Sequence, residues 1–488
     1  MDAFDIFDAP DDAPAAPPPL LPRASTHPHF CHWSADEQSD AAPSVQEATN
    51  LLRACMADRV EAASRGLKKS RSQYGRDCAR SLLDAWTPIC NDSSDEALLH
   101  DDVRRNAQAC IDLCATAIEE SNWDAAAWPE ANLLALALLV VALLSRTADA
   151  EPIGKTAIAL FNQACASANL LPPGRPPAWR PCVRAVLRCA EAAVAAAWPP
   201  AADITASRDD HSLWLIPTRP PGNGLTPLLD PSRRVRELDV SQLSSASFFE
   251  EHLSRGVPVL IRGHLAAEQW EALAYFRDLR RLHADAGARL VPISLGSPLV
   301  GYAGVVHWPL RKLIDEYLLP SNATHDMPRE SGRAPDEEGD CKVAYMTQHH
   351  LLHQQPQLQR LLAVPPFTLG RELSPTNVWI GTRGTVTSLH SDPSDNLLCQ
   401  VAGFKYFRLY DLDQTPKIYA TTQRANNTNS FGTSPVRVEA PIPPEHAMAA
   451  DATYVEGLLA PGDMLFLPKS MWHYVRSLTT SVSVNFWY

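Results

Sequence analysis

The sequence predicts a chain of two parts, an all-α N-terminal half followed by a β-rich half folded as a sandwich or double-sheet jelly roll. Residues 44–198 repeat apolar side chains every three or four positions and contain few β-branched residues, a pattern typical of helices. From residue 236 to residue 488, short β-branched and aromatic segments alternate with turn residues, which indicates strands. Residues 199–235 are rich in Pro, Asp and Gly, and we expect them to link the two parts.

The composition is that of a globular protein with an acidic balance. The 488 residues suffice for two to four domains, and 43 basic against 56 acidic residues give a net charge of −13. Direct binding to nucleic acid is not expected, because it requires a local excess of Lys and Arg. The 11 cysteines are scattered as reduced thiols are, and Met1–Asp12 lacks the apolar segment of a secretory signal. We therefore expect the protein inside the cell.

The N-terminal half shows no catalytic motif. Residues 1–43 are acidic and then rich in Pro and Ala, so we expect a disordered tail. The longest apolar run, Leu133–Leu144, is too short to cross a bilayer core of about 30 Å as a helix, which predicts a buried helix and no membrane partner. Cys110 and Cys114 lie one helical turn apart, and core packing is the favoured interpretation. We expect this half to support the second one or to bind a partner protein.

The second half contains a series of strand-like segments, most of them separated by turn signals. These segments are 257–263, 289–296, 376–381, 384–391, 397–403, 404–410, 463–468, 473–478 and 481–488. Helical patterns occur mainly early, at 265–285 and 306–318. Residues 320–340 are polar, and we expect a surface loop there.

A group of three residues has the pattern of a metal site. His390 and Asp392 stand two apart at the end of a strand-like segment, so both side chains project to the same face. His473 follows 83 residues later, after a turn and another strand. Strands far apart in sequence lie side by side in a double sheet, so His473 could complete a set of two histidines and one carboxylate. That set suits a non-haem Fe(II) centre.

The same His-X-Asp pattern occurs at His100-Asp102 and at His283-Asp285. Both copies fall in helical patterns, where residues two apart point about 200° away from each other. Neither pair is therefore expected to hold one ion.

Lys405 alternates with Phe407 and Leu409, which places a lysine on an apolar face of its strand. A buried ammonium group needs an anionic partner, because an unpaired buried charge is very costly. Two interpretations stay open: a structural ion pair or snorkelling lysine, or a receptor for the distal carboxylate of a dicarboxylate such as 2-oxoglutarate.

Four stretches of the second half resemble a known family. They are NVWIG at 377–381, SLHSDPSDNLLCQVAGFKYFRLY at 388–410, PGDMLFLPKSMWHYVRSL at 461–478 and the terminal SVSVNFWY at 481–488. From about Val257 to Tyr488 the chain resembles a cupin-like Jumonji-C (JmjC) domain, a double-stranded β-helix. It is particularly similar to the subfamily described both as histone lysine demethylases and as protein arginyl hydroxylases. The helical half resembles that subfamily only in character.

The resemblance implies that His390, Asp392 and His473 bind Fe(II). It also implies that a set of polar and aromatic residues contacts the cosubstrate, 2-oxoglutarate. These residues are Lys405, Asn396, Thr387, Tyr345, Trp379 and Asn485. For Trp379 a place in the core, and for Asn396 a turn cap, stay open as alternatives. His349, His350 and His353 suggest a second metal cluster, but we expect them on the surface of a helix or loop.

The activity that the resemblance implies is oxidation by O2, with 2-oxoglutarate consumed alongside. It favours hydroxylation of a protein side chain, in particular an arginyl one, over histone lysine demethylation. A third alternative is a catalytically silent jelly roll that acts as a binding scaffold. The presence of the three metal ligands and of Lys405 argues against that alternative. The acidic chain suits a basic protein or peptide substrate, and the resemblance places the protein in the nucleus, the cytoplasm or both.

Overall fold

The structure is a computed structural model, and it describes most of the chain. The described residues are 43–69, 73–90, 96–119, 127–145, 150–169, 180–197, 211–222, 226–297, 301–319, 343–368, 370–371, 373–374, 376–421 and 432–488. Residues 1–42 of the predicted tail and the predicted loop 320–340 lie outside the described residues.

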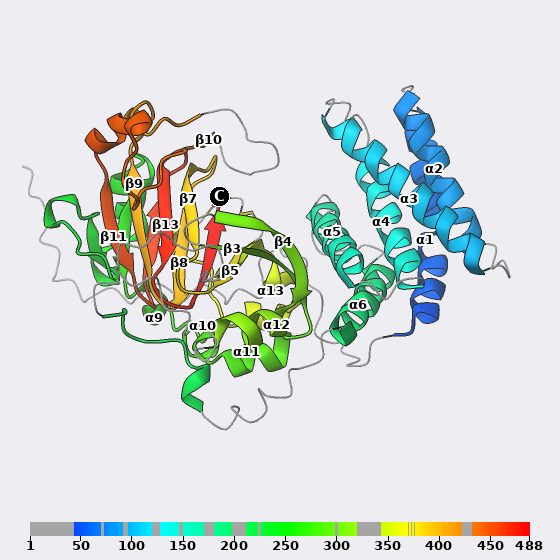
Figure 1. The fold of residues 1–488 in the computed structure, drawn as a ribbon, viewed down its shortest axis with the longest axis horizontal. Coiled ribbons are helices and arrows are strands. Elements are labelled where there is room, and N and C mark those ends of the chain that lie inside the picture. Colours follow the sequence, from blue (N-terminus) through cyan, green and yellow to red (C-terminus); the bar gives the residue numbers. More distant parts are fainter. Residues whose placement is uncertain are drawn as a thin grey trace, which may run out of the picture.

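The N-terminal half is helical, as predicted (Figure 1). Its helices are α1 (Val45–Lys69), α2 (Gln73–Cys90), α3 (Glu96–Glu119), α4 (Ala127–Leu144), α5 (Ala150–Asn169) and α6 (Arg180–Ala197). Helix α4 contacts each of the other five and is almost free of solvent from Leu133 to Ala142, which confirms the buried helix predicted there. None of the helices in the described ranges is long and apolar enough to span a membrane.

The C-terminal half is built from two sheets. The larger has nine strands in the order β1 (Glu237–Asp239), β2 (Val259–Arg262), β12 (Met464–Leu467), β8 (Asn396–Ala402), β14 (Ser481–Trp487), β6 (Asn377–Gly381), β5 (Val343–His349), β3 (Leu290–Ser297) and β4 (Gly301–Pro309). The smaller has five in the order β10 (Gly432–Thr433), β7 (Val386–Ser391), β13 (Trp472–Ser477), β9 (Lys405–Tyr410) and β11 (Val455–Leu459). This arrangement confirms the predicted fold class, a helical part followed by a double-sheet jelly roll.

Short helices accompany the sheets. They are α8 (Ser245–Phe248), α9 (His264–Ala267), α10 (Ala272–Arg277), α11 (Leu279–Ala286), α12 (Leu310–Leu313), α13 (Leu351–Gln354) and α14 (Pro356–Gln359). Residues 306–318 were expected to be helical throughout, and for 306–309 that prediction is wrong. These residues pair with β3 as the end of β4, and the helix begins only at Leu310, after Pro309 in an extended conformation.

Alternation along the strands separates two surfaces of the larger sheet. In β14, Val482, Val484 and Phe486 pack into an apolar cluster with residues of α10 and α11. The side chains between them, including Ser483 and Asn485, point to the opposite face, because successive residues of a strand alternate. That opposite face meets the smaller sheet across a second apolar cluster, to which both sheets contribute. The space between the sheets therefore has an apolar end and a polar end.

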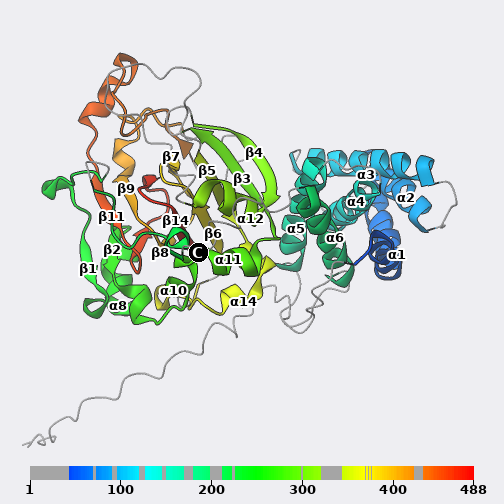
Figure 2. The same cartoon turned by 60° about the horizontal axis from the view of Figure 1, so that its bottom comes forward.

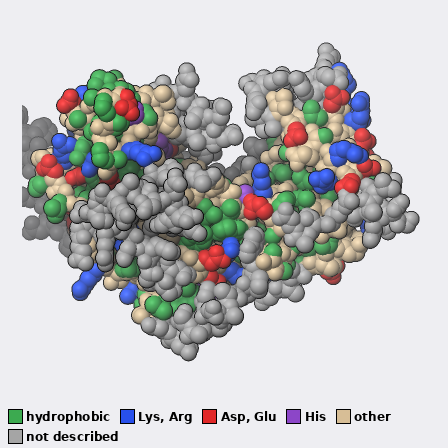
Figure 3. Space-filling model, viewed as in Figure 1, with side chains coloured by type: hydrophobic (Ala, Val, Ile, Leu, Met, Phe, Trp, Pro, Cys, Tyr) green, Lys and Arg blue, Asp and Glu red, His purple; other side chains and the backbone are tan. Residues whose placement is uncertain are grey.

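The two halves are in contact through α5 and α6, which lie against β3 and β4 (Figures 1 and 2). Arg289 pairs with Glu191, and the His307 ring nitrogen Nδ1 lies 3.0 Å from Glu151 Oε1. Figure 3 shows one face of the molecule, hollowed between the halves, with acidic and basic side chains interspersed over the helical half. The described part of the predicted linker 199–235 contributes the buried residues Trp214 and Ile216 to the core of the β-rich half.

Candidate metal centre

His390, Asp392 and His473 converge at one end of the space between the sheets. His390 in β7 and His473 in β13 are directly paired across the smaller sheet, and Asp392 follows β7. Asp392 Oδ1 lies 3.7 Å from His390 Nε2, and Asp392 Oδ2 lies 3.7 Å from His473 Nε2. The two imidazole centroids are 4.1 Å apart, and one ligand atom from each residue lies within 4.8 Å of the others. The three residues form a group that could hold a metal ion.

The backbone holds both imidazoles in the form that a metal requires. His390 Nδ1 lies 2.8 Å from the carbonyl oxygen of Ser388, and His473 Nδ1 lies 3.0 Å from that of Met471. A carbonyl oxygen can only accept a hydrogen bond, so each Nδ1 carries the proton and donates it. The lone pair of each imidazole is therefore on Nε2, which faces Asp392. Metal-binding histidines are held in this way, with the other ring nitrogen donating to a backbone carbonyl or a carboxylate.

Burial shifts the pKa values of two residues in this group, His390 and Asp392. Burial, with the nearby His473 as a second cause, lowers the pKa of His390 to about 3. Burial raises the pKa of the Asp392 carboxyl, against a smaller opposing effect of His473. A neutral His390 imidazole and a carboxylate whose burial is costly are groups that a bound cation stabilises. Two nitrogens and one carboxylate are also the donor set of non-haem Fe(II) centres, so the residues fit that ion.

An irregularity in β7 determines where Thr387 lies. Two residues separate Thr387 from His390, whereas one separates their partners Val475 and His473 on β13. The partners share a face of β13, so Thr387 and His390 share a face of β7 as well. Strict alternation along β7 would have placed Thr387 on the opposite face. The bulge thus turns Thr387 toward the side of the sheet that carries the metal group.

Lys405 lies on the inner face of β9, in alternation with Phe407 and Leu409 as predicted. Its side chain is almost completely buried, and Nζ donates to the hydroxyl of Tyr345 at 3.4 Å. Within the described part of the chain, no carboxylate oxygen lies within 4.0 Å of Nζ, so the alternative of a structural ion pair finds no partner there. Burial lowers the pKa of Lys405 to about 7.

The remaining predicted residues line the inner face of the larger sheet, whereas Lys405 lies on the smaller one. The indole Nε1 of Trp379 donates to Asn485 Oδ1 at 2.7 Å, and Asn485 Nδ2 donates to Asn396 Oδ1 at 3.2 Å. The ring of Tyr345 lies 5.9 Å from that of Trp379. The structure therefore brings Tyr345, Trp379, Asn485 and Asn396 together as one connected group, with Lys405 attached through Tyr345.

A glycine makes room for that group. A Cβ atom on Gly381 would lie 2.6 Å from Cδ2 of Tyr345, which is closer than real Cβ contacts come. Gly381 is paired with Tyr345 across β5 and β6, so the tyrosine ring occupies the space above it. The position of the Tyr345 hydroxyl against Lys405 therefore depends on the absence of a side chain at residue 381.

Sequence reasoning missed several buried polar residues on this face. Ser483 Oγ donates to Gln400 Oε1 at 2.6 Å, and Thr385 Oγ1 donates to Ser477 Oγ at 2.8 Å. Ser477 Oγ also lies 3.1 Å from Ser481 Oγ. The signal was present in the terminal segment SVSVNFWY, where polar residues alternate with valines. Such alternation in a buried strand predicts one polar and one apolar face.

The second predicted His-X-Asp decoy behaves as expected. His283 Nε2 lies 3.1 Å from Asp315, while Asp285 accepts a hydrogen bond from the hydroxyl of Tyr275 at 2.9 Å. The two side chains have different partners, because residues two apart on helix α11 point in different directions. The side chain of His100 lies outside the described residues.

The expectation that His349 and His353 lie on a surface is wrong. Each is only 1% exposed, and His350 is partly buried. The reason is the contact between the two halves: the ring of His349 lies 5.9 Å from that of Phe161 in α5. Burial lowers the pKa of His349 to about 3, which keeps the ring neutral inside this contact.

Comparison with known proteins agrees with this architecture. Residues 245–488, half of the chain, match a family described as a cupin-like domain. Lysine-specific demethylase 8 of Danio rerio is 34% identical over 268 residues, which are 54% of this chain and 60% of that protein. Its namesake of Xenopus tropicalis is 30% identical over 269 residues, covering 54% of this chain and 55% of that protein.

A human relative is named for a different activity. The bifunctional peptidase and (3S)-lysyl hydroxylase JMJD7 of Homo sapiens is 26% identical over 262 residues, which are 49% of this chain and 80% of that protein. Against the two demethylases, the chain spans little more than half of the relative's length. Further relatives carry the JmjC domain in their names. The chain therefore belongs to the cupin-like family of JmjC-domain proteins.

Proposed function

We propose that this chain is an oxygenase that depends on Fe(II) and 2-oxoglutarate and hydroxylates a protein side chain. The observation that carries the proposal is the pairing of two features on one inner face. One is a group of two imidazoles and a carboxylate with both Nε2 atoms directed at Asp392. The other is the buried ammonium group of Lys405, whose nearest polar partner described is the Tyr345 hydroxyl.

The three ligands have distinct tasks in this proposal. His390 and His473 offer Nε2 lone pairs, and their Nδ1–H bonds to backbone carbonyls hold the rings in place before a metal binds. Asp392 offers a carboxylate whose burial cost a divalent cation offsets. Bound iron and 2-oxoglutarate would supply an oxidation in which one atom of O2 enters succinate as the cosubstrate loses CO2, and the other atom hydroxylates a substrate C–H bond.

Lys405 and its neighbours would bind the cosubstrate. The distal carboxylate of 2-oxoglutarate is the anion that the buried ammonium group requires, and Tyr345 adds a hydroxyl donor beside it. Asn396, Asn485 and Thr387 contribute polar groups on the surrounding surfaces, and Trp379 forms part of the wall. The low exposure of Asp392 and His473 keeps most water away from the reacting groups.

Three arguments support the substrate class that we propose. The relatives from Danio rerio and Xenopus tropicalis are named as lysine-specific demethylases, and the human relative is named as a lysyl hydroxylase. A net charge of −13 favours a basic substrate. The resemblance of the motifs favours an arginyl side chain. We therefore propose a basic protein side chain, arginyl before lysyl, in a protein of the nucleus or cytoplasm.

Demethylation is the second candidate, and the names of the two demethylases favour it. The two reactions share their first product, a hydroxylated carbon. When that carbon is the methyl carbon on a lysine nitrogen, the hydroxylated product is a hemiaminal, which breaks down to the amine and releases the carbon as formaldehyde. When it is a side-chain methylene, the hydroxyl group stays.

Mass spectrometry separates the candidates. The purified chain is incubated with Fe(II), 2-oxoglutarate and peptides that contain Arg, Lys or methylated Lys. We expect a gain of one oxygen atom on an Arg or Lys peptide, together with succinate. Loss of a CH2 unit from methylated Lys would instead establish the demethylase, and no succinate with any peptide would establish a silent scaffold.

Two variants control this assay. His473→Ala removes a proposed iron ligand, and we expect product formation to fall at least about a hundredfold. His446→Ala removes a histidine outside the metal group, whose ring contacts Tyr419, and should leave turnover unchanged. Equal activity of both variants would contradict the assignment of His473.

A further inference from the structure

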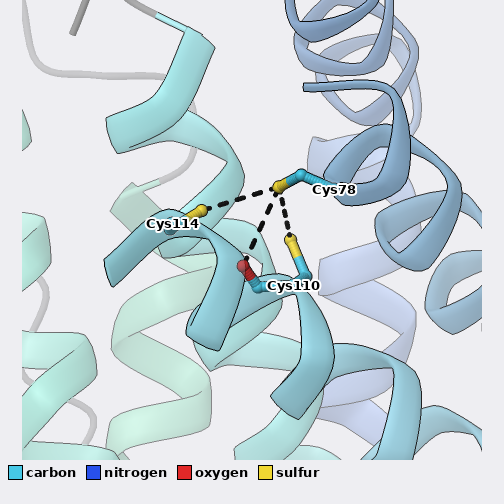
Figure 4. A group of neighbouring side chains, drawn as sticks. All are labelled: Cys78, Cys110 and Cys114. Carbon is cyan, nitrogen blue, oxygen red and sulfur yellow. Dashed lines mark hydrogen bonds between the residues drawn. The ribbon is translucent and has the colours of Figure 1, made fainter. Parts of the chain in front are cut away.

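Three cysteine side chains meet in the core of the helical half, away from the proposed iron centre. Cys110 and Cys114 lie one turn apart on α3, and Cys78 projects toward both from α2 (Figure 4). Cys78 Sγ lies 3.4 Å from Cys110 Sγ and 3.7 Å from Cys114 Sγ. All three are at most 2% exposed. The sequence shows only the pair on α3, because Cys78 joins it through the packing of α2 against α3.

The spacing of the sulfur atoms matches that of a three-sulfur metal site. Thiolate sulfurs bind at about 2.3 Å from a zinc-sized ion, so three of them around one ion lie about 4.0 Å apart in a plane and slightly closer in a pyramid. Two of the distances here are 3.4 and 3.7 Å, and all three sulfurs lie within 4.8 Å of one another. Side-chain movements of a few tenths of an ångström would bring the set to bonding distance.

The chemistry of the donors restricts the ion. The described residues of this group offer sulfur alone, without a carboxylate or imidazole. Sulfur-only sets select soft ions with a filled d shell, such as Cu⁺ and Zn²⁺, over the harder ions that oxygen ligands bind. Fe(II) in a set of two imidazoles and one carboxylate is a different chemistry, so the two groups would take different metals.

We propose that Cys78, Cys110 and Cys114 form a binding site for one thiophilic d¹⁰ metal ion, Cu⁺ or Zn²⁺, that joins α2 to α3. Each thiol that becomes a ligand releases its proton to solvent, so binding is accompanied by proton release and strengthens as pH rises. The ion binds the folded helices and not the separated chain, so it stabilises the helical half. This inference is independent of the proposed oxygenase activity.

The test is carried out on the full chain with the iron group disabled. The background variant His390→Ala/His473→Ala removes two ligands of the other group, so a bound metal reports on the cysteines. Under a non-thiol reductant, Zn²⁺ and Cu⁺ are added in separate arms, and the metal that remains after gel filtration is counted. We expect one equivalent to be retained, with a sulfur-to-metal charge-transfer absorption in the ultraviolet and a higher melting temperature of the helical half.

Matched cysteine variants complete the test. In that background, Cys110→Ala should lower the affinity for the added metal at least about a hundredfold. Cys182→Ala removes another buried cysteine of the helical half and should leave the affinity for the metal unchanged. Cys78→Ala and Cys114→Ala, each checked for folding by circular dichroism, serve if Cys110→Ala does not fold. Failure of both metals to give a charge-transfer band, or equal retention by all cysteine variants, would overturn the proposal and leave the cluster as ordinary core packing.

Discussion

The buried position of Lys405 destabilises the ligand-free fold, and the substitution Lys405→Met should remove this destabilisation. Burial lowers the pKa of this ammonium group from its ordinary 10.5 to about 7. At about 1.4 kcal/mol for each pKa unit, burial of the fully protonated lysine costs the ligand-free fold about 5 kcal/mol. At pH 7, where about half of the folded molecules have released the proton, the cost is about 4 kcal/mol. Methionine fills a similar volume without a charge. We therefore expect the variant, without cosubstrate, to be more stable by up to about 4 kcal/mol.

The same variant should lose its response to the cosubstrate. A ligand at a hundred times its Kd stabilises the protein that binds it by about 2.7 kcal/mol. With Mn²⁺ in the metal site, 2-oxoglutarate should raise the stability of the wild type by about that amount and leave Lys405→Met unchanged. A gain in ligand-free stability, together with the loss of stabilisation by 2-oxoglutarate, distinguishes a cosubstrate receptor from a structural lysine.

Urea unfolding followed by tryptophan fluorescence, with and without 2-oxoglutarate, measures both effects. Lys417→Met serves as the matched control, because its Nζ makes one exposed hydrogen bond to the carbonyl oxygen of Asp451. The lowered pKa of Lys405 also defines whether the folding stability rises or falls with pH. The unfolded chain binds the Lys405 proton more tightly than the folded one between pH 7 and 10.5, so wild-type stability should rise across that window and the increment should be missing from Lys405→Met. A ligand-free variant that is less stable than the wild type would refute the reasoning.

Three further predictions concern the same structure. The affinity for 2-oxoglutarate, measured by calorimetry with Mn²⁺, should fall about tenfold for each pH unit above 7, since the carboxylate binds protonated Lys405; a flat profile would contradict this. Gly381→Ala should displace the Tyr345 ring and raise the KM for 2-oxoglutarate about tenfold without changing metal affinity. Glu191→Ala should leave the partly buried Arg289 without this ion pair and lower the free energy of unfolding in urea by about 2 kcal/mol; a loss below about 1 kcal/mol would argue against the ion pair.

Local patterns predicted the elements and most of the ligand set. Each predicted strand segment overlaps an observed strand, because alternation and turn residues reflect local backbone geometry. Five strands escaped prediction: the short β1 and β10, and also β4, β5 and β11. Val343–His349 and Gly301–Pro309 carry no clear alternation. Residue type and spacing suggested His390, Asp392 and His473 as a metal site, the family resemblance pointed to the same three residues, and the structure brings their ligand atoms together.

By itself, the sequence determined which residues alternate, which helix is apolar on all sides and which side chains carry metal-binding chemistry. Only the tertiary structure decided which of them meet. The bulge that turns Thr387 toward the metal group, the tyrosine that contacts Lys405 from 60 residues away and the third cysteine that joins the pair on α3 all depend on pairings between distant segments. The physical reason is that local patterns report the conformation of a few neighbouring residues. Contacts across sheets and helices depend on how whole elements bury their apolar faces together.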